Sequence, residues 1–344
     1  MRYSKLTIDE FDEQVRDWDA SLTDVTAPMN ETEYVDGKLV TTEQTIFGQS
    51  RVEGHLTENG FRTLCYKLDA PHVWLRDKCP SDLKKTIFDR LMRDYEKDCL
   101  FRYRENGVKL CRAVLSDRYM PFNHLDVWDA VKDGIEKSKL SQLHPIVWKP
   151  YLDDTMSVWI LFEGVQADPD KPVRSYDGGG SGGLKPAIKI SNSEDGTGKV
   201  KLFGGLYRSY CDNGVIFGFN SETKIEQIHA GSQIKLVSAN IRIAIAETAH
   251  VAGLGIDKYI DATNEYITGA IDEVFDEWAN KYNIAVETTT EWKGFTSRIE
   301  TWGDLVMATA DFGGTRKNRE EMEAFETMAG DLLYANRSQY VVRR

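Results

Sequence analysis

The sequence predicts an α+β protein in which helices pack on an antiparallel sheet built from hairpins, with a helical C-terminal third. Three observations lead to this fold class. Asn106-Gly107 separates two runs rich in β-favouring residues, which is a hairpin signal. Residues 187–192 and 200–206 are a second such pair around a turn-rich segment. From about residue 232 onward, apolar residues recur at three- and four-residue spacing, which is typical of amphipathic helices.

Composition limits the class of protein. The chain has 344 residues with 41% hydrophobic side chains, enough to bury a sizeable core. We expect no membrane partner, because no apolar run approaches the roughly 18 residues of a membrane span and the N-terminus lacks a signal peptide's apolar segment. The five cysteines are scattered without C-x-x-C spacing. We therefore expect reduced thiols in a cytoplasmic location, with no zinc site and no disulfide framework.

Residues 1–44 are predicted to form an acidic N-terminal helix followed by a connector. Thr7-Ile8-Asp9-Glu10 is a capping-box pattern, and apolar residues then follow at helical spacing, so we expect a helix over 7–19. Residues 20–44 are polar and rich in turn-forming residues. This composition is typical of a connector and not of a core.

Residues 45–256 are predicted to form the α+β core domain. We expect helices at 81–95 and 125–135, and a central strand at 158–162. The expected hairpin pairs are 46–52 with 61–68 around the turn Glu58-Asn59-Gly60, 99–104 with 108–115, and 187–192 with 200–206; a further strand is expected at 214–219. A flexible glycine-rich loop is predicted at 167–186. It satisfies G-x-G-x-x-G formally, but Pro186 and a strand pattern follow it, so it does not indicate a dinucleotide site.

Residues 257–344 are predicted to be an acidic helical region that packs on the core. Apolar stripes at helical spacing run through residues 260–278, 302–312 and 319–335. The segment 257–331 carries 7 Lys/Arg against 17 Asp/Glu, and it accounts for much of the net charge of −12.

One basic segment lies between these acidic ends. Residues 61–119 carry 14 Lys/Arg against 9 Asp/Glu, with interleaved aromatic residues that include Tyr66, Trp74 and Tyr119. Cationic side chains beside aromatic planes can hold phosphates and stack on bases. The candidate nucleic-acid-binding residues are Arg102, Arg104, Arg112, Arg118, Arg208, Tyr119 and Tyr207. The alternative is that Arg118 and Arg208 are buried structural arginines paired with Asp117, Glu194 or Asp212.

Motifs for catalysis and for cofactor binding are missing from the sequence. The six histidines show no metal-ligand spacing. Gly196-Thr197-Gly198-Lys199 lacks the first glycine and the final Ser or Thr of a phosphate-binding loop. We therefore predict no catalytic residues, no metal and no cofactor.

Three segments resemble a known family. Arg112-Ala113-Val114-Leu115-Ser116-Asp117-Arg118-Tyr119, Asn192-Ser193-Glu194-Asp195-Gly196 and Tyr207-Arg208-Ser209-Tyr210-Cys211-Asp212-Asn213-Gly214 are similar to motifs of the phage/plasmid-like proteins known as domain of unknown function nine-thirty-two. Trp302-Gly303-Asp304-Leu305 resembles a later motif but lacks its usual Asn. The resemblance covers roughly residues 100–335. It implies a gene carried by phages or plasmids, a role in mobile-element DNA metabolism, and therefore the cytoplasm of a bacterial host cell as the location.

Three functions are compatible with these observations. The first is a non-enzymatic protein that binds or anneals single-stranded DNA, acting as a homo-oligomer with a positive groove lined by the candidate arginines. The second is a protein-binding or assembly factor acting on a host or phage protein through its acidic helices. The third is an enzyme with an unrecognised site, whose metal-dependent form would bring carboxylates and a histidine together at neighbouring strand ends.

Overall fold

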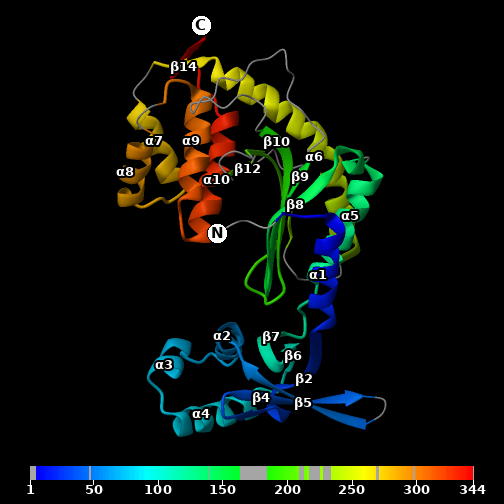
Figure 1. Ribbon diagram of the computed structural model, residues 1–344. Helices are drawn as coiled ribbons and strands as arrows, with labels where there is room; N and C mark the ends of the chain where they lie inside the picture. The colour runs from blue at the N-terminus through cyan, green and yellow to red at the C-terminus, as the bar shows by residue number, and fades with distance from the viewer. Residues whose placement is uncertain are drawn as a thin grey trace.

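The computed structural model describes residues 5–45, 48–138, 140–162, 184–208, 213–216, 225–227, 234–268, 271–296 and 299–343. The predicted α+β class is confirmed, but the described residues form two large sheets where the sequence predicted one. Figure 1 shows these sheets in two lobes, one above the other, with α1 and β2 running from one lobe to the other.

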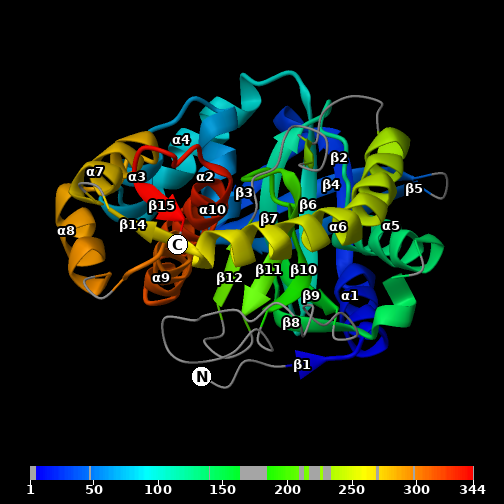
Figure 2. The ribbon, with the colours of Figure 1, turned by 90° about the horizontal axis from the view of Figure 1, so that it is seen from above.

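The large lobe is built on an antiparallel sheet with the strand order β1-β8-β9-β10-β11-β12, with β13 also paired to β11. Its strands are β1 (Lys5–Leu6), β8 (Pro145–Leu152), β9 (Thr155–Phe162), β10 (Leu184–Ser193), β11 (Val200–Arg208), β12 (Asn213–Ile216) and β13 (Ile225–Gln227). Helices α1 (Ile8–Ala20), α5 (His124–Lys137) and α6 (Ile234–Thr263) enclose a core on one face, and a short 3-10 turn, η2 (Leu140–Leu143), precedes β8. Figure 2 shows α6 crossing the strands of this sheet.

The small lobe is built on a second sheet with the order β2-β6-β7-β5-β4-β3, in which only the β5–β7 pair is parallel. Its strands are β2 (Leu22–Pro28), β3 (Glu33–Val35), β4 (Lys38–Thr45), β5 (Gly48–Leu56), β6 (Asp98–Asn106) and β7 (Val108–Ser116), with a 3-10 turn η1 (Met29–Glu31) between β2 and β3. Helices α2 (Glu58–Lys67), α3 (His72–Asp77) and α4 (Ser81–Arg93) bury an apolar core against one face.

The C-terminal residues form a helical cluster with its own core. It contains β14 (Glu265–Ile267), α7 (Ile271–Lys281), α8 (Val286–Phe295), α9 (Trp302–Gly314), α10 (Arg319–Tyr334) and β15 (Val341–Arg343). Trp292, Trp302 and Phe325 are buried at its centre. The ammonium of Lys189 on β10 lies 2.9 Å from the carboxylate of Glu326 on α10, and this buried ion pair joins the cluster to the large lobe. No helix in the described part is long and apolar enough to cross a membrane.

Several sequence predictions are confirmed at the level of single elements. The Thr7–Glu10 capping box is present at the start of α1. Strands β6 and β7 form the predicted hairpin, and Gly107 in its turn has a φ of +70°. The central strand predicted at 158–162 lies in β9, which pairs with β8 and β10, and the predicted pair 187–192 with 200–206 is formed by β10 and β11.

Two predictions about the small lobe are wrong. Residues 20–44 are not a connector, because they form β2, β3 and most of β4 and bury Val25, Met29 and Leu39. Residues 61–68 are not a strand, because they lie in α2 and at its end. The predicted turn at Glu58-Asn59-Gly60 is the first turn of that helix.

Gly60 shows why the turn prediction failed. A Cβ atom at this position would lie 2.2 Å from the carbonyl oxygen of Cys111 on β7. Gly60 therefore allows α2 to pack close to β7. Its backbone does not adopt the conformation of a tight turn.

The structure places two predicted domain boundaries inside elements. The boundary at residue 44 falls in β4, and the boundary at residue 256 falls in α6. The apolar stripe predicted over 260–278 is interrupted by β14. Of the glycine-rich loop predicted at 167–186, residues up to 183 lie outside the described residues, as do residues 217–219 of another predicted strand. The predicted division into domains stays a prediction.

Candidate functional site

A β-bulge in the β6–β7 hairpin puts two arginines on the same face of the small-lobe sheet. Arg102 pairs with Ala113, but the next residue of β6, Tyr103, pairs with Cys111, so Arg112 is the extra residue of the bulge. Cys111 and Tyr103 belong to the core under the helices, whereas Ala113 lies on the opposite face. The bulge turns the Arg112 side chain toward the large lobe together with Arg102.

Arg102 is completely buried and bonded to both lobes. Its Nε donates to Asp24 Oδ1 at 2.9 Å within the small lobe. Its Nη1 donates to the carbonyl oxygen of Glu194 at 2.6 Å, and its Nη2 donates to Asn123 Oδ1 at 2.6 Å. These partners use the charge and the three donor nitrogens of the guanidinium.

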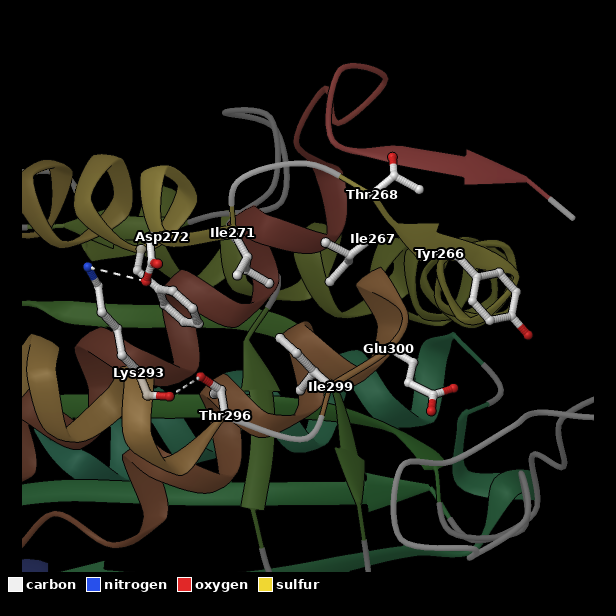
Figure 3. A pocket seen from close by; sticks show the side chains of 10 residues that line it. Tyr266, Ile267, Thr268, Ile271, Asp272, Lys293, Thr296, Ile299 and Glu300 are labelled. Carbon is white, nitrogen blue, oxygen red and sulfur yellow. Dashed lines mark hydrogen bonds and ion pairs between the residues drawn. The ribbon is translucent and has the colours of Figure 1, made fainter.

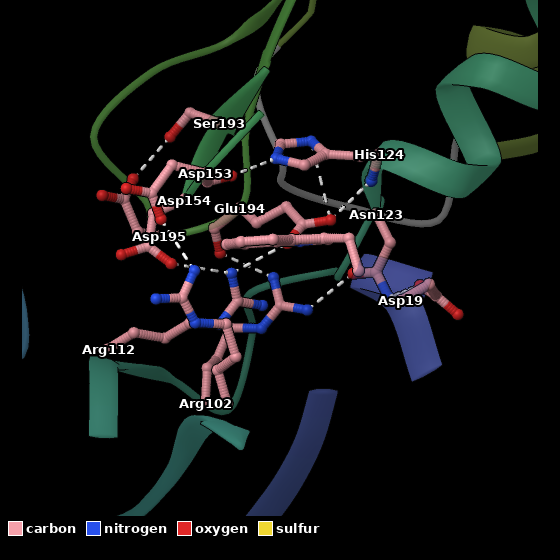
Figure 4. A network of polar contacts seen from close by, with 12 residues as sticks. Asp19, Arg102, Arg112, Asn123, His124, Asp153, Asp154, Ser193, Glu194 and Asp195 are labelled. Atoms are coloured by element: carbon pink, nitrogen blue, oxygen red, sulfur yellow. Dashed lines mark hydrogen bonds and ion pairs between the residues drawn. The ribbon is translucent and has the colours of Figure 1, made fainter. Parts of the chain in front are cut away.

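Glu194, at the end of β10, is the centre of the network shown in Figure 4. Arg112 Nη1 lies 2.8 Å from Glu194 Oε2 and 3.3 Å from Asp154 Oδ1. Glu194 also accepts from the backbone N–H of His124 at 2.5 Å and from Trp18 Nε1 at 3.1 Å. Both side chains of the Arg112–Glu194 pair are closed to solvent.

The electrostatics of the two carboxylates differ. Burial alone would raise the pKa of Glu194, but the adjacent positive charges, Arg112 among them, and the hydrogen bond from the His124 backbone lower it overall. Burial raises the pKa of Asp154, and Arg112 offsets this only in part. Of the two carboxylates that face Arg112, Glu194 is therefore the one whose ionised form the surroundings favour.

His124, at the start of α5, is a neutral member of the network. Its Nε2 lies 2.8 Å from the carbonyl oxygen of Asp153, and its Nδ1 lies 3.0 Å from Asn192 Nδ2. These partners fit a proton on Nε2 and a lone pair on Nδ1. Burial lowers the pKa of the imidazole, which agrees with this assignment.

The other predicted site residues lie in different environments. Arg104 lies 2.8 Å from Asp153 Oδ1, and its guanidinium carbon lies 4.4 Å from the centre of the Trp18 ring. The Tyr119 ring lies 5.9 Å from the guanidinium of Arg102. Arg118 is exposed and has no ion pair with any described residue, so the alternative that it is a buried structural arginine is wrong. The side chains of Tyr207 and Arg208 lie outside the described part.

The structure therefore brings Arg102, Arg104, Arg112 and Tyr119 together, but at the junction between the lobes and not along an open positive groove. Arg102 and Arg112 are enclosed by the large-lobe residues Asn123, Asp154 and Glu194. Their charges are neutralised inside the protein. They position the small lobe against the large lobe.

A different part of the basic segment is open to solvent. Tyr66 at the end of α2 is 66% exposed, although the sequence prediction placed it on a strand. Lys67 follows Tyr66 in the chain and lies close to Cys99. Burial raises the pKa of the Cys99 thiol, and the positive charge of Lys67 offsets part of this increase. Because Cys99 pairs with Ser116, Lys97 and Arg118 flank the same end of the sheet, together with Asp98 and Asp117, whose charges raise the pKa of the Cys99 thiol. We call Tyr66, Lys67, Lys97 and Arg118 the exposed basic corner.

The exposed basic corner continues toward α3. The Tyr66 and His72 rings have centroids 5.5 Å apart. Beyond His72, α3 exposes Val73 and Trp74, and the exposed Lys78 follows its last residue. Tyr66 and Trp74 were among the aromatic residues that the sequence indicated. The exposure of Tyr66 could not be predicted because residues 61–68 were assigned to a strand.

The polar network has the composition that the enzyme alternative predicts, with His124, Glu194 and Asp154 near strand ends. Within the described residues, however, no group of three His, Cys, Asp or Glu side chains could hold a metal ion. His124 and Glu194 are fully buried and use their polar atoms on protein partners. Nε and Nη2 of Arg112 are the donors of the network that have no partner in the structure. The enzyme alternative stays a prediction.

No family model, curated protein or solved structure matches the chain. The resemblance of residues 112–119, 192–196 and 207–214 to the phage/plasmid-like family therefore remains an expectation, and function must be argued from the geometry above.

Proposed function

We propose that the protein is a non-enzymatic single-stranded DNA-binding protein that contacts the strand with its exposed basic corner. The observation that carries this proposal is the two-thirds exposed ring of Tyr66, which Lys67 follows in the chain, with Lys97 and Arg118 at the nearby end of the small-lobe sheet. No ion pair joins any of these three cations to a described residue. They are free to meet phosphates.

The chemistry of the corner suits a flexible strand better than a duplex. An exposed aromatic ring can stack on an unpaired base, and such stacking is worth about 1–3 kcal/mol per base. Cations beside the ring neutralise phosphates in any sequence. A duplex keeps its bases stacked on one another, so Tyr66 would add nothing to its binding.

The net charge of −12 is compatible with a local binding surface. Salt screens charges over about 8–10 Å, so acidic residues of the C-terminal cluster have little effect on a distant corner. The buried Arg102 and Arg112 contribute indirectly under this proposal. They fix the small lobe against the large lobe, and so they orient the surface that carries Tyr66.

The biological setting is part of the proposal. The resemblance to phage/plasmid-like proteins supports a role in the DNA metabolism of a mobile element, with the bacterial cytoplasm as the place of action and a homo-oligomer as the active form. Single-strand annealing in recombination is the activity such a protein would perform.

The test is fluorescence anisotropy with a labelled oligothymidine and with a duplex of the same length, at about 50 and about 200 mM salt. The intact protein should prefer the single strand. Tyr66→Ala should weaken binding by about 1–3 kcal/mol, whereas Tyr66→Phe should bind normally because it keeps the ring. Arg118→Ala should reduce the salt slope by about 0.7.

Lys317→Ala is the matched control, because Lys317 is an exposed lysine of the C-terminal cluster. It should change neither affinity nor salt slope. Absence of binding by the intact protein, or equal losses for Tyr66→Ala and Lys317→Ala, would contradict the proposal.

A further inference from the structure

A cavity of about 590 Å³ opens in the C-terminal helical cluster, far along the chain from the exposed basic corner. It lies between β14, the first turns of α7, the end of α8 and residues 299–300, as Figure 3 shows. This volume is within the range of sites that bind small molecules, about 300–1,000 Å³.

The floor of the cavity is apolar. Ile267, Ile271, Phe275 and Ile299 line it and pack on the buried core of the cluster. The Phe275 ring meets the buried Trp292 ring edge to face, with centroids 4.5 Å apart, so this part of the floor is held in place. Such a floor favours a ligand with an apolar body.

The rim of the cavity is acidic. Asp272 and Glu300 are the lining carboxylates, and both are exposed. The one lining cation among the described residues, Lys293, lies 2.7 Å from Asp276 and 3.7 Å from Asp272. Its ammonium is therefore engaged by two carboxylates and is not free for an anionic ligand. Figure 3 shows Lys293 and Asp272 at one end of the cavity, and Glu300 with Tyr266 at the other.

Glu300 has no cationic partner among the described residues, and it lies at the same end as an aromatic ring. A carboxylate beside an aromatic side chain is a favourable environment for an organic ammonium, through charge and through the cation–π interaction. Its location in the acidic segment 257–331, with 7 Lys/Arg against 17 Asp/Glu, adds to the attraction.

We infer that this cavity binds a small amphipathic cation, with the ammonium group at Glu300 and the apolar body on the isoleucine floor. The inference is independent of DNA binding, because the cavity and the exposed basic corner share no residues.

The test compares three probes that share an apolar phenylalkyl chain and differ in their terminal group: 4-phenylbutylamine, 4-phenylbutanol and 4-phenylbutyrate. Binding to the full-length protein is measured by titration calorimetry without nucleic acid. We expect the amine to bind most tightly, the alcohol more weakly and the carboxylate least. Glu300→Gln should weaken binding of the amine by about fivefold and leave the affinity for the alcohol unchanged. Ile271→Trp should reduce binding of the amine and the alcohol together, because the indole fills the cavity.

Glu287→Gln is the control, since Glu287 is an exposed carboxylate of α8 outside the lining. Thermal melts of every variant should match that of the wild type, which separates a lost site from a lost fold. Failure of all three probes to bind, or tighter binding of 4-phenylbutyrate than of the amine, would overturn the inference. Equal effects of Glu300→Gln and Glu287→Gln on the amine would do the same.

Discussion

The guanidinium of Arg112 and the carboxylate of Glu194 lie 2.8 Å apart, and both side chains are closed to solvent although they come from different lobes. Removing two such groups from water costs several kcal/mol per ion, and their attraction offsets this only where the geometry is good. The Glu194 carboxylate accepts from two further donors, Trp18 Nε1 and the backbone N–H of His124, which supply that geometry. The pair therefore specifies one orientation of the lobes more than it adds stability.

Glu194→Gln should destabilise the protein by about 3–5 kcal/mol, because it leaves the buried charge of Arg112 without its main partner. The urea midpoint measured by intrinsic fluorescence reports this. The double variant Glu194→Gln/Arg112→Met should recover part of the loss, since neither charge is then buried. Glu53→Gln, which breaks an exposed ion pair with Lys38, should leave the midpoint almost unchanged. A Glu194→Gln protein as stable as the wild type would show that the pair does not hold the lobes together.

Stability should fall as the pH drops below about 6.5. Burial lowers the pKa of His124 on folding, so the unfolded chain binds the proton more strongly than the folded one. The stability contributed by the neutral imidazole is complete above its unfolded pKa and is lost below it. The lowered pKa of Glu194 acts in the same direction at lower pH, and the raised pKa of Asp154 acts in the opposite direction.

Urea midpoints at about pH 7.5 and about pH 5.5 test this dependence. His124→Gln should lower the urea midpoint at both pH values. The decrease in its midpoint between the higher and the lower pH should be smaller than that of the wild type. His55→Gln, at an exposed position on β5, should show the same decrease in urea midpoint between the two pH values as the wild type. Identical pH profiles for the wild type and His124→Gln would mean that another group is responsible.

Gly60→Ala should destabilise the small lobe by about 3 kcal/mol or more, because its Cβ would overlap the carbonyl of Cys111 and push α2 away from β7. Gly294→Ala in α8 is the opposite case, with open space at the Cβ position, and it should stabilise by up to about 1 kcal/mol. Differential scanning calorimetry of the two variants gives the comparison. A Gly60→Ala protein that melts with the wild type would rule out the close helix–strand contact.

Gly107→Val should cost about 1–3 kcal/mol, because a β-branched residue would be forced to the φ of +70° in the β6–β7 turn. Nothing lies within 4 Å of a Cβ at this position, so the cost is conformational and not steric crowding by neighbours. Gly107→Asn should cost much less, since asparagine tolerates a left-handed backbone. If the two variants unfold at the same urea concentration, the turn does not constrain the hairpin.

Local signals in the sequence predicted much of the fold. A capping box gives α1, an Asn-Gly turn gives the β6–β7 hairpin, and three- and four-residue spacing gives α5, α9 and α10. The failures have a physical cause in long-range contact. Gly60 looks like a turn residue in the sequence, and only the position of Cys111 shows that it permits close packing.

The candidate site was harder to predict for the same reason. The sequence indicated Arg102 and Arg112, but their burial depends on a bulge and on Glu194, which is more than 80 residues away in the chain. The sequence analysis named Glu194 only as a partner for Arg118 or Arg208. Asp153 and Asp154 looked like ordinary acidic residues because nothing local marks their partners. Tyr66 was indicated as an aromatic of the basic segment, yet its exposure follows from the helical state of α2, which the sequence analysis missed.

The order of the strands has a consequence for synthesis on the ribosome. β1 and α1 pack against β8 and α5, whereas every strand of the small-lobe sheet lies between Leu22 and Ser116. In a nascent chain the small-lobe sheet can therefore form as soon as Ser116 has emerged from the ribosome. β1 and α1 can pack in the large lobe only after residues 124–152 have emerged as well. During that interval Phe11 and Val15 have no core to enter, so the polar face of α1 must keep the exposed helix soluble.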